Sequence, residues 1–138
     1  MKIGVTGSSG LVGFNFCKEA LRHNDKLNIL IRSDADYLNQ LGAETFYGDL
    51  NDKKVLDEFC KGCDVIIHSA AMISIGLDSY EEVYEVNYLG TKNLLESCVK
   101  MKVKKFIYIS SINAFNKNPV KKKLDETREL VRSGNSND

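Results

Sequence analysis

Residues 2–13 read KIGVTGSSGLVG, an apolar run that meets three glycines and then continues as a helical pattern. Ile3 to Thr6 has the short apolar character of a buried parallel strand. From Leu11 onward, apolar side chains recur at helical spacing. The stretch therefore predicts a strand, a glycine turn and a helix, in that order.

The three glycines fit separate tasks in a phosphate-binding turn. Gly7 permits the tight turn out of the strand, Gly10 lets the backbone approach a pyrophosphate, and Gly13 lets the helix press against the sheet. Free N–H groups at the helix N-terminus supply the positive end that an anion requires. The alternative is a glycine turn that binds nothing. The strand before the turn and the helix after it favour a nucleotide ligand.

Composition and length limit the classes of protein. The 138 residues are enough for one domain with a core, and 19 basic and 19 acidic residues give a formal net charge of zero. No overall field therefore indicates nucleic acid or an anionic membrane as a partner. The sequence shows no signal peptide or spanning helix, so we expect a cytoplasmic protein with its four cysteines reduced.

The second predicted strand, residues 27–31, ends at Arg32. In a dinucleotide-binding unit the adenosine ribose lies over the tip of this strand, where an acidic residue would accept hydrogen bonds from the ribose 2′-hydroxyl. Arg32 instead offers a cation and a donor fork to a 2′-phosphate. The sequence therefore favours NADP, with NAD as the alternative. A solvent-facing arginine at a strand end is the competing interpretation.

Asp49 follows the third predicted strand, residues 43–47. A carboxylate just past the end of such a strand lies on the ligand side of the sheet and can accept a hydrogen bond from an adenine amino group. Asp49 could equally cap the next helix, which begins near Asp52. Because Asn51 and Asp52 are closer to that helix, we expect Asp49 to face the ligand.

The fourth predicted strand, residues 64–68, ends in the small residues Ser69, Ala70 and Ala71. Small side chains at a strand tip leave room for backbone and ligand to touch. His68 could act as a general base, but its place inside the strand favours a packed core histidine.

Residues 80–101 form the longest predicted helix, and Asn87 and Thr91 interrupt its apolar stripe one turn apart. Polar groups that face a sheet require partners, either the main chain of neighbouring strand tips or a ligand. Tyr88 and Lys92 share the spacing of a tyrosine-lysine catalytic pair. We do not assign them that role, because their helix precedes the strand whose serine would join them.

Cys60-Lys61-Gly62-Cys63 has the spacing of a redox or zinc motif. A structural zinc site needs two more ligands, and no second pair of cysteines or histidines has suitable spacing. We interpret the motif as a helix end, a glycine turn and a strand start, and predict no metal site.

The fifth predicted strand, residues 104–109, brings Ser110 and Ser111 to the ligand edge of the sheet. We expect a nucleotide-binding domain over residues 1–115 and a partly ordered C-terminal segment over residues 116–138. Within that segment, residues 124–131 predict a short helix, and the final residues have a disordered composition.

These motifs together carry a resemblance to the extended short-chain dehydrogenase/reductase family, the NAD-dependent epimerase/dehydratase group. The order and spacing of five stretches match it: Thr6–Gly13, Gly48–Leu50, His68–Ala71, Val86–Thr91 and Tyr108–Ser111. Arg32 resembles the dihydroflavonol-reductase-like branch, which favours NADP. The resemblance implies an α/β fold, a Rossmann-type doubly wound parallel sheet with strand order 3-2-1-4-5 and helices on both faces.

The resemblance also implies a set of site residues. The cofactor would be lined by Gly7, Ser9, Gly10, Leu11, Val12, Gly13, Arg32, Asp49, Leu50, Ala70 and Ala71. Ser111 would be the catalytic hydroxyl that hydrogen-bonds the substrate oxygen, with Ser110 as its alternate. The family's tyrosine and lysine are absent, because no tyrosine follows Ser111. We therefore expect that the C-terminal substrate lobe is absent too.

The implied activity is hydride transfer at a hydroxyl or keto carbon, as an NAD(P)-dependent oxidoreductase or an epimerase/dehydratase. The expected substrate is a small-molecule carbonyl, an alcohol or a nucleotide sugar, and assembly as a homodimer is compatible with the family. The competing hypothesis is an NAD(P)-binding sensor or scaffold that does no chemistry.

Overall fold

The structure, a computed structural model, describes residues 1–33, 36–73, 79–116, 119–121 and 123–131. The chain forms two compact units, Met1–Tyr108 (unit 1) and Ile109–Asp138 (unit 2). The assignment of residues 1–115 as the nucleotide-binding domain stays a prediction.

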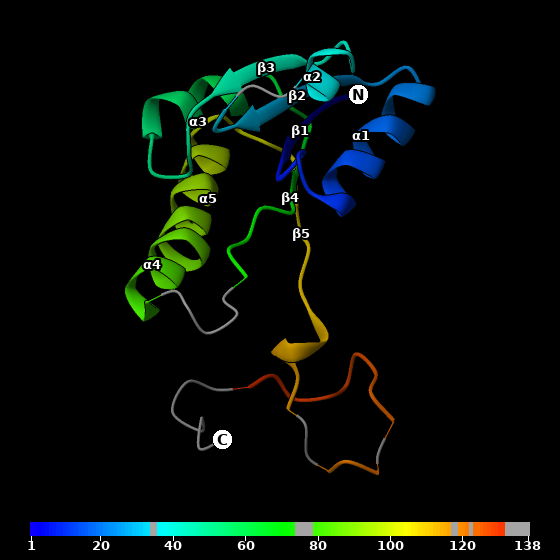
Figure 1. The fold of residues 1–138 in the computed structure, drawn as a ribbon, viewed down its shortest axis with the longest axis vertical. Helices are drawn as coiled ribbons and strands as arrows, with labels where there is room; N and C mark the ends of the chain where they lie inside the picture. The colour runs from blue at the N-terminus through cyan, green and yellow to red at the C-terminus, as the bar shows by residue number, and fades with distance from the viewer. Residues whose placement is uncertain (34–35, 74–78, 117–118, 122, 132–138) are drawn as a thin grey trace. The chain divides into compact units, whose positions relative to one another are not determined.

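Unit 1 is built on a five-stranded parallel sheet with the order β3-β2-β1-β4-β5 (Figure 1). The strands are β1 (Lys2–Thr6), β2 (Lys26–Ile31), β3 (Glu44–Tyr47), β4 (Val65–His68) and β5 (Lys105–Tyr108). The chain moves outward from β1 to β3 and then returns to the other side of β1 at β4. The predicted strand order and the doubly wound α/β class are confirmed, and the switch point lies between β1 and β4.

Helices cover both faces of this sheet. Figure 1 shows α1 (Leu11–Arg22) on one side and α3 (Lys53–Cys60) and α5 (Gly90–Lys100) on the other. Short helices α2 (Asp36–Asn39) and α4 (Tyr80–Tyr84) complete the unit. A π-helical turn, η1 (Glu85–Leu89), joins α4 directly to α5, so residues 80–100 form one continuous helix with a local change of pitch.

The alternation of apolar residues along the strands creates a separate core on each face. Ile29 and Ile31 pack with Cys17 of α1, whereas Leu30 between them packs with Phe59 and other apolar residues of α3 and α5. Successive strand side chains point to opposite faces, so a strand covered on both sides has a continuous apolar sequence.

Side-chain caps fix the starts of two helices. The Asp52 carboxylate accepts hydrogen bonds from the amides of Lys54 and Val55 at the start of α3. Ser79 and Glu82 form a reciprocal capping box at the start of α4. The N-cap of α1 is Gly10, which has no side chain to satisfy the helix N-terminus. This helix start therefore differs from the other two in having its amides open to another acceptor.

The cysteine motif has the structural role predicted for it. Cys60 is the last residue of α3, Gly62 has a φ of 72°, and Cys63 is buried just before β4. All four cysteines are free thiols, and Cys60 Sγ lies 3.9 Å from Cys98 Sγ across the contact between α3 and α5. Among the described residues, no group of three or more His, Cys, Asp or Glu side chains is placed to hold a metal ion.

In unit 2 the predicted short helix is wrong. Residues 124–131 do not form a helix, because Leu130 pairs with Phe115 in an isolated antiparallel bridge. The Asp125 carboxylate accepts hydrogen bonds from both the amide and the hydroxyl of Thr127, which favours a turn over a helix. The Arg128 guanidinium then donates to main-chain carbonyl groups, including that of Pro119.

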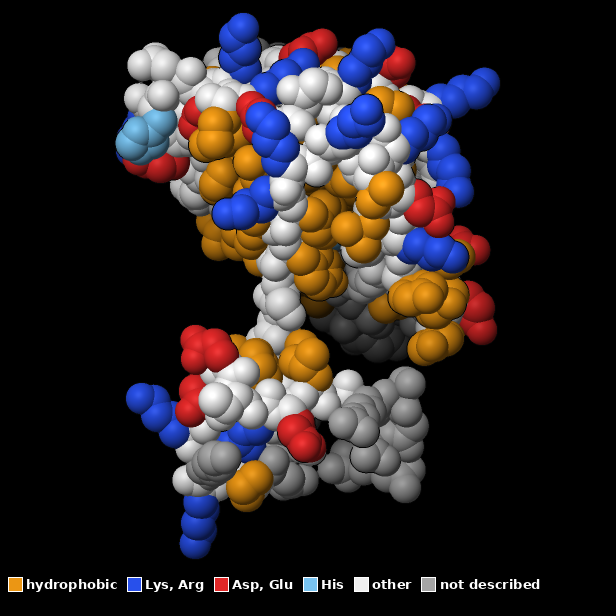
Figure 2. Space-filling model, turned by 180° about the vertical axis from the view of Figure 1, so that it is seen from behind, with side chains coloured by type: hydrophobic (Ala, Val, Ile, Leu, Met, Phe, Trp, Pro, Cys, Tyr) orange, Lys and Arg blue, Asp and Glu red, His pale blue; other side chains and the backbone are white. Residues whose placement is uncertain are grey.

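The surface of unit 1 carries charges of both signs and some exposed apolar side chains. Figure 2 shows hydrophobic side chains gathered toward the middle of one face, with Lys and Arg side chains scattered around them. The edge strand β5 contributes Ile107 and Tyr108, which are 39% and 50% exposed. In the described part of the chain, no helix has both the length and the apolar composition needed to cross a membrane.

Candidate functional site

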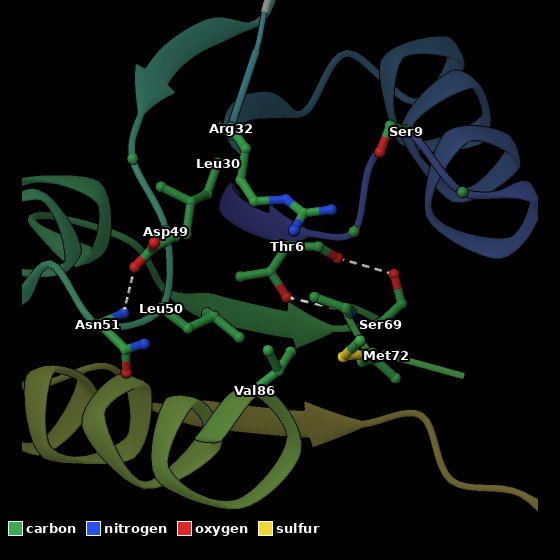
Figure 3. A pocket seen from close by; sticks show the side chains of 15 residues that line it. Thr6, Ser9, Leu30, Arg32, Asp49, Leu50, Asn51, Ser69, Met72 and Val86 are labelled. Atoms are coloured by element: carbon green, nitrogen blue, oxygen red, sulfur yellow. Dashed lines mark hydrogen bonds between the residues drawn. The ribbon is translucent and has the colours of Figure 1, made fainter. Parts of the chain in front are cut away.

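A cavity of about 270 Å³ opens at the carboxyl ends of the central strands, at the switch point of the sheet (Figure 3). Residues from the tips of β1, β2, β3 and β4 and from η1 surround it. The lining consists of Thr6, Gly7, Ser9, Gly10, Leu30, Arg32, Gly48, Asp49, Leu50, Asn51, Ser69, Ala70, Ala71, Met72 and Val86.

Most of the predicted cofactor residues line this cavity: Gly7, Ser9, Gly10, Arg32, Asp49, Leu50, Ala70 and Ala71. Leu11, Val12 and Gly13 do not. Leu11 and Val12 are 83% and 54% exposed, and their main-chain amides stand at the start of α1. Gly13 is buried behind the turn, where its role is packing.

Two of the glycines are required by the packing of the protein itself. Gly7 has a φ of 72°, and a Cβ atom there would lie 2.5 Å from the Ala70 nitrogen. A Cβ atom on Gly13 would overlap the carbonyl group of Gly7. The absence of both side chains therefore lets the start of α1 lie close to the tips of β1 and β4.

Gly10 is different. Its φ of −84° and ψ of 165° suit any residue, and a Cβ atom would meet only the Gly7 carbonyl oxygen, at 3.3 Å. Neither backbone strain nor severe crowding therefore requires a glycine here. Gly10 also lines the cavity, so the missing side chain leaves its backbone accessible from there.

The start of α1 directs backbone donors to the same place. The Gly10 amide donates to Gly7 O at 3.0 Å, and the helical ladder begins with the Phe14 amide, which donates to Gly10 O at 2.9 Å. The amides of Leu11, Val12 and Gly13 precede that ladder and form the positive end of the helix dipole. An anion at Gly10 would accept hydrogen bonds from them.

Arg32 and Asp49 stand at the outer part of the cavity. Figure 3 shows the Arg32 guanidinium extending from the tip of β2 into the cavity, and within the described residues it forms no ion pair. Asp49 does not cap α3, because Asp52 does so, as predicted. One Asp49 oxygen accepts a hydrogen bond from the Asn51 amide at 2.7 Å, which fixes the carboxylate beside the cavity.

His68 is a fully buried histidine, as predicted, and it is held by two threonines. Its Nδ1 lies 2.6 Å from the Thr6 hydroxyl oxygen and its Nε2 lies 2.9 Å from the Thr91 hydroxyl oxygen. Burial lowers the pKa of His68 to about 4. The imidazole is therefore neutral at physiological pH, and it does not line the cavity.

Asn87 finds its partner in the main chain of the loop that follows β4, four residues beyond the end of that strand. Its side-chain oxygen accepts from the Met72 amide at 2.7 Å, and its side-chain nitrogen donates to Met72 O at 2.9 Å. The Thr91 hydroxyl donates to Asn87 O at 2.7 Å. The π-turn that carries Asn87 and Val86 toward the cavity had no clear signal in the sequence.

Tyr88 and Lys92 do not contribute to the cavity. Tyr88 is 54% exposed and stacks on Tyr84, with 4.8 Å between ring centroids. Ser111 belongs to unit 2, where its hydroxyl oxygen caps a 3₁₀ turn by accepting from the Asn113 amide at 3.3 Å. Its role toward a substrate stays a prediction.

Sequence reasoning did not single out several residues that line the cavity, notably Thr6, Met72 and Val86. Thr6 had an available signal, since a polar residue at the end of an apolar central strand lies on the ligand edge of the sheet. Met72 and Val86 had no signal in the sequence that would place them at the cavity. Their placement depends on the loop after β4 and on the local pitch of the long helix.

A doubly wound sheet with a cavity at its switch point and a glycine turn beside it defines a Rossmann-type α/β protein. Within that class the chain belongs to the 3-beta hydroxysteroid dehydrogenase/isomerase family, whose sequence pattern matches residues 4–136.

Named relatives cover most of this chain but only part of their own length. Sterol demethylase protein B of Methylococcus capsulatus is 32% identical over 117 residues, which are 83% of this chain and 36% of that protein. A Synechocystis protein that bears the name dihydroflavonol 4-reductase is 32% identical over 125 residues, which are 89% of this chain and 36% of that protein. The chain thus spans about a third of the length of these relatives.

A solved structure gives the same result for the fold. The UDP-glucose 4-epimerase of Thermus thermophilus, in complex with NAD, superposes with a TM-score of 0.80 at 26% identity. The match covers 95% of this chain and 44% of the epimerase.

Proposed function

We propose that this chain binds NADP(H), with NAD(H) as the weaker alternative, as the cofactor-binding part of a reductase, dehydrogenase or epimerase that acts at a hydroxyl or keto carbon. The observation that carries this proposal is Gly10. It is a glycine that the packing of the protein does not require, at the cavity and at the N-terminus of α1.

Residues at the cavity would serve the pyrophosphate and the adenosine half of a dinucleotide. The amides of Leu11 and Val12 would hold the pyrophosphate, and Arg32 would lie at the adenosine ribose. The Asp49 carboxylate would accept a hydrogen bond from the adenine amino group. When bound, the cofactor supplies a nicotinamide ring that donates or accepts hydride.

Ser111 is our candidate for the hydroxyl that hydrogen-bonds the substrate oxygen. Its hydroxyl oxygen accepts from the Asn113 amide, so its proton is available for donation to a substrate. Family membership and the sterol- and flavonol-related names of the relatives favour a small carbonyl or alcohol as substrate. Because the similar solved structure is a UDP-glucose 4-epimerase, a nucleotide sugar is the alternative substrate class.

The test of the proposal is calorimetric titration of the purified chain with NADP⁺, NADPH, NAD⁺ and NADH. We expect saturable binding with one site per chain. A folded chain that binds none of the four would disprove the proposed function.

Cofactor preference provides a second prediction. Replacement of Arg32 by aspartate is expected to reverse the preference from NADP to NAD. A guanidinium paired with a partly exposed phosphate contributes about 1.5–3 kcal/mol, or about tenfold to a hundredfold in affinity. The aspartate would also repel a 2′-phosphate and accept hydrogen bonds from a 2′-hydroxyl. Parallel titrations with both cofactors at one ionic strength measure the change.

Ser33→Asp is the matched control for added charge, because Ser33 is the exposed neighbour of Arg32 and does not line the cavity. It should weaken NADP binding less than Arg32→Asp does. If the unaltered chain already binds NAD more tightly than NADP, our interpretation of Arg32 is wrong.

A further inference from the structure

The buried side chain of His68 joins two segments that are far apart in the sequence. His68 is the last residue of β4, and the register pairs it with Thr6 at the end of β1 and with Tyr108 at the end of β5. The Tyr108 ring stacks on the imidazole at 5.4 Å between centroids and at an angle of 26°. The imidazole therefore lies in an apolar layer, and its two nitrogens must find partners inside the protein.

One arrangement of protons gives every donor in this network an acceptor. In it the Thr91 hydroxyl donates to Asn87 O and accepts from His68, so Nε2 is assigned as the protonated nitrogen. Nδ1 is then an acceptor, and the Thr6 hydroxyl donates to it at 2.6 Å. The Thr6 oxygen accepts in turn from the Ala70 amide, at 3.4 Å. All donors in this network find acceptors in one consistent arrangement.

The network begins and ends on the same cavity-lining segment. One end is the Ala70 amide, bound to Thr6, and the other is the Met72 main chain, bound to the Asn87 side chain. Between these ends the bonds run through His68 and Thr91, behind the cavity. Residues 70–72 are therefore anchored at both ends, at one end by Thr6, which lines the cavity, and at the other by Asn87, which does not.

We propose that His68, as the neutral Nε2–H tautomer between Thr6 and Thr91, is a positioning residue for the dinucleotide. It holds residues 70–72 against the tip of β1 and against η1, and so maintains the floor of the cavity. The proposal rests on the proposed function for the identity of the ligand, but the network itself does not depend on it.

The tautomer is tested directly by long-range ¹H–¹⁵N NMR of the imidazole rings in the unaltered chain. The chain has two histidines, and His23→Gln assigns the exposed one. We expect His68 to be neutral and protonated at Nε2 at neutral pH. A ring that is charged, or protonated at Nδ1, would overturn the proposal.

Thr91 provides the functional test, because it does not line the cavity. Thr91→Val removes the acceptor of Nε2–H without a large change of shape, and should weaken NADP(H) binding about fivefold, the effect of one hydrogen bond. Thr91→Ser keeps the hydroxyl and should bind within about twofold of the unaltered chain. Exchange of the Met72 amide hydrogen should become faster in Thr91→Val and stay slow in Thr91→Ser.

Ile29→Val is the matched control for loss of stability, since it shortens a buried side chain of β2 that has no part in the network. It should leave NADP(H) affinity and Met72 exchange unchanged. A folded Thr91→Val chain with unaltered affinity, or an equal loss in Ile29→Val, would overturn the proposal. If the unaltered chain binds no dinucleotide, the proposed function is refuted instead. The His68 tautomer and the exchange rate of the Met72 amide then still test whether the hydrogen-bond network exists.

Discussion

Replacement of Gly10 by valine is expected to abolish dinucleotide binding and to leave the fold intact. Within the protein a Cβ atom at this position meets only Gly7 O, at 3.3 Å, a tight contact that a shift of a few tenths of an ångström relieves, and the backbone conformation suits a β-branched residue. The valine methyl groups would occupy the space in which a pyrophosphate must approach the amides of Leu11 and Val12. Each hydrogen bond to a charged group contributes about 1.5–3 kcal/mol, so the loss of two predicts an affinity decrease of about a hundredfold or more.

Calorimetry with NADP⁺ measures the affinity, and circular dichroism verifies that the variant is folded. Gly10→Ala should have an intermediate effect, because one methyl group intrudes less. Gly13→Val is the informative contrast, since its side chain would overlap the Gly7 carbonyl group and should destabilise the fold itself. Equal affinities of the unaltered and Gly10→Val chains would contradict the assignment of the glycine turn.

The fold could be predicted from the sequence because its signals are local and repeated. Apolar runs such as Ile3 to Thr6 and Val65 to His68 are continuous, which is typical of parallel strands covered on both faces. Each is followed by small or turn residues and then by a helical pattern, and this alternation leaves few topologies. The particular order β3-β2-β1-β4-β5 was implied by the family resemblance, and the structure confirms it.

The candidate site could be predicted where its residues lie within a few positions of the end of a strand. Arg32, Asp49 and Ala70 belong to this group, and all three line the cavity. Val86 and Met72 do not follow this rule, because a π-turn and a loop bring them to the cavity. A single extra residue in a helical turn changes which side chains face inward, and residue periodicity does not reveal it.

The contacts of His68 and the structure of residues 124–131 show a second limit of prediction from sequence patterns. Burial of His68 was predictable from its strand, but its tautomer depends on the direction in which the Thr91 hydroxyl donates. The helix predicted for residues 124–131 was wrong because Asp125 and Leu130 form a turn and a β-bridge. Side-chain bonds to nearby backbone compete with helix formation, and the apolar pattern does not include them.

The 138-residue chain is expected to bind cofactor and to show no turnover with keto sugars, flavonoid-like ketones or steroid-like alcohols. A serine hydroxyl such as that of Ser111 can orient a carbonyl group, but it does not exchange protons efficiently at neutral pH without a tuned partner. No tyrosine follows it in the sequence. A positioned acid-base group contributes about a hundredfold to ten-thousandfold to a rate, so its absence should reduce activity by that factor.

The measurement is oxidation of NADPH by the purified chain in the presence of each substrate class. A longer polypeptide that continues this chain through a tyrosine, and a lysine four residues later, should turn over one of these classes. Tyr88→Phe is the matched control: Tyr88 is exposed, stacks on Tyr84 and lies outside the cavity, so its loss should change nothing. NADPH oxidation by the 138-residue chain that disappears in Ser111→Ala would contradict the prediction and require a proton donor within residues 1–138. Inactivity of every longer form that still binds NADP(H) would favour a sensor or scaffold over an enzyme.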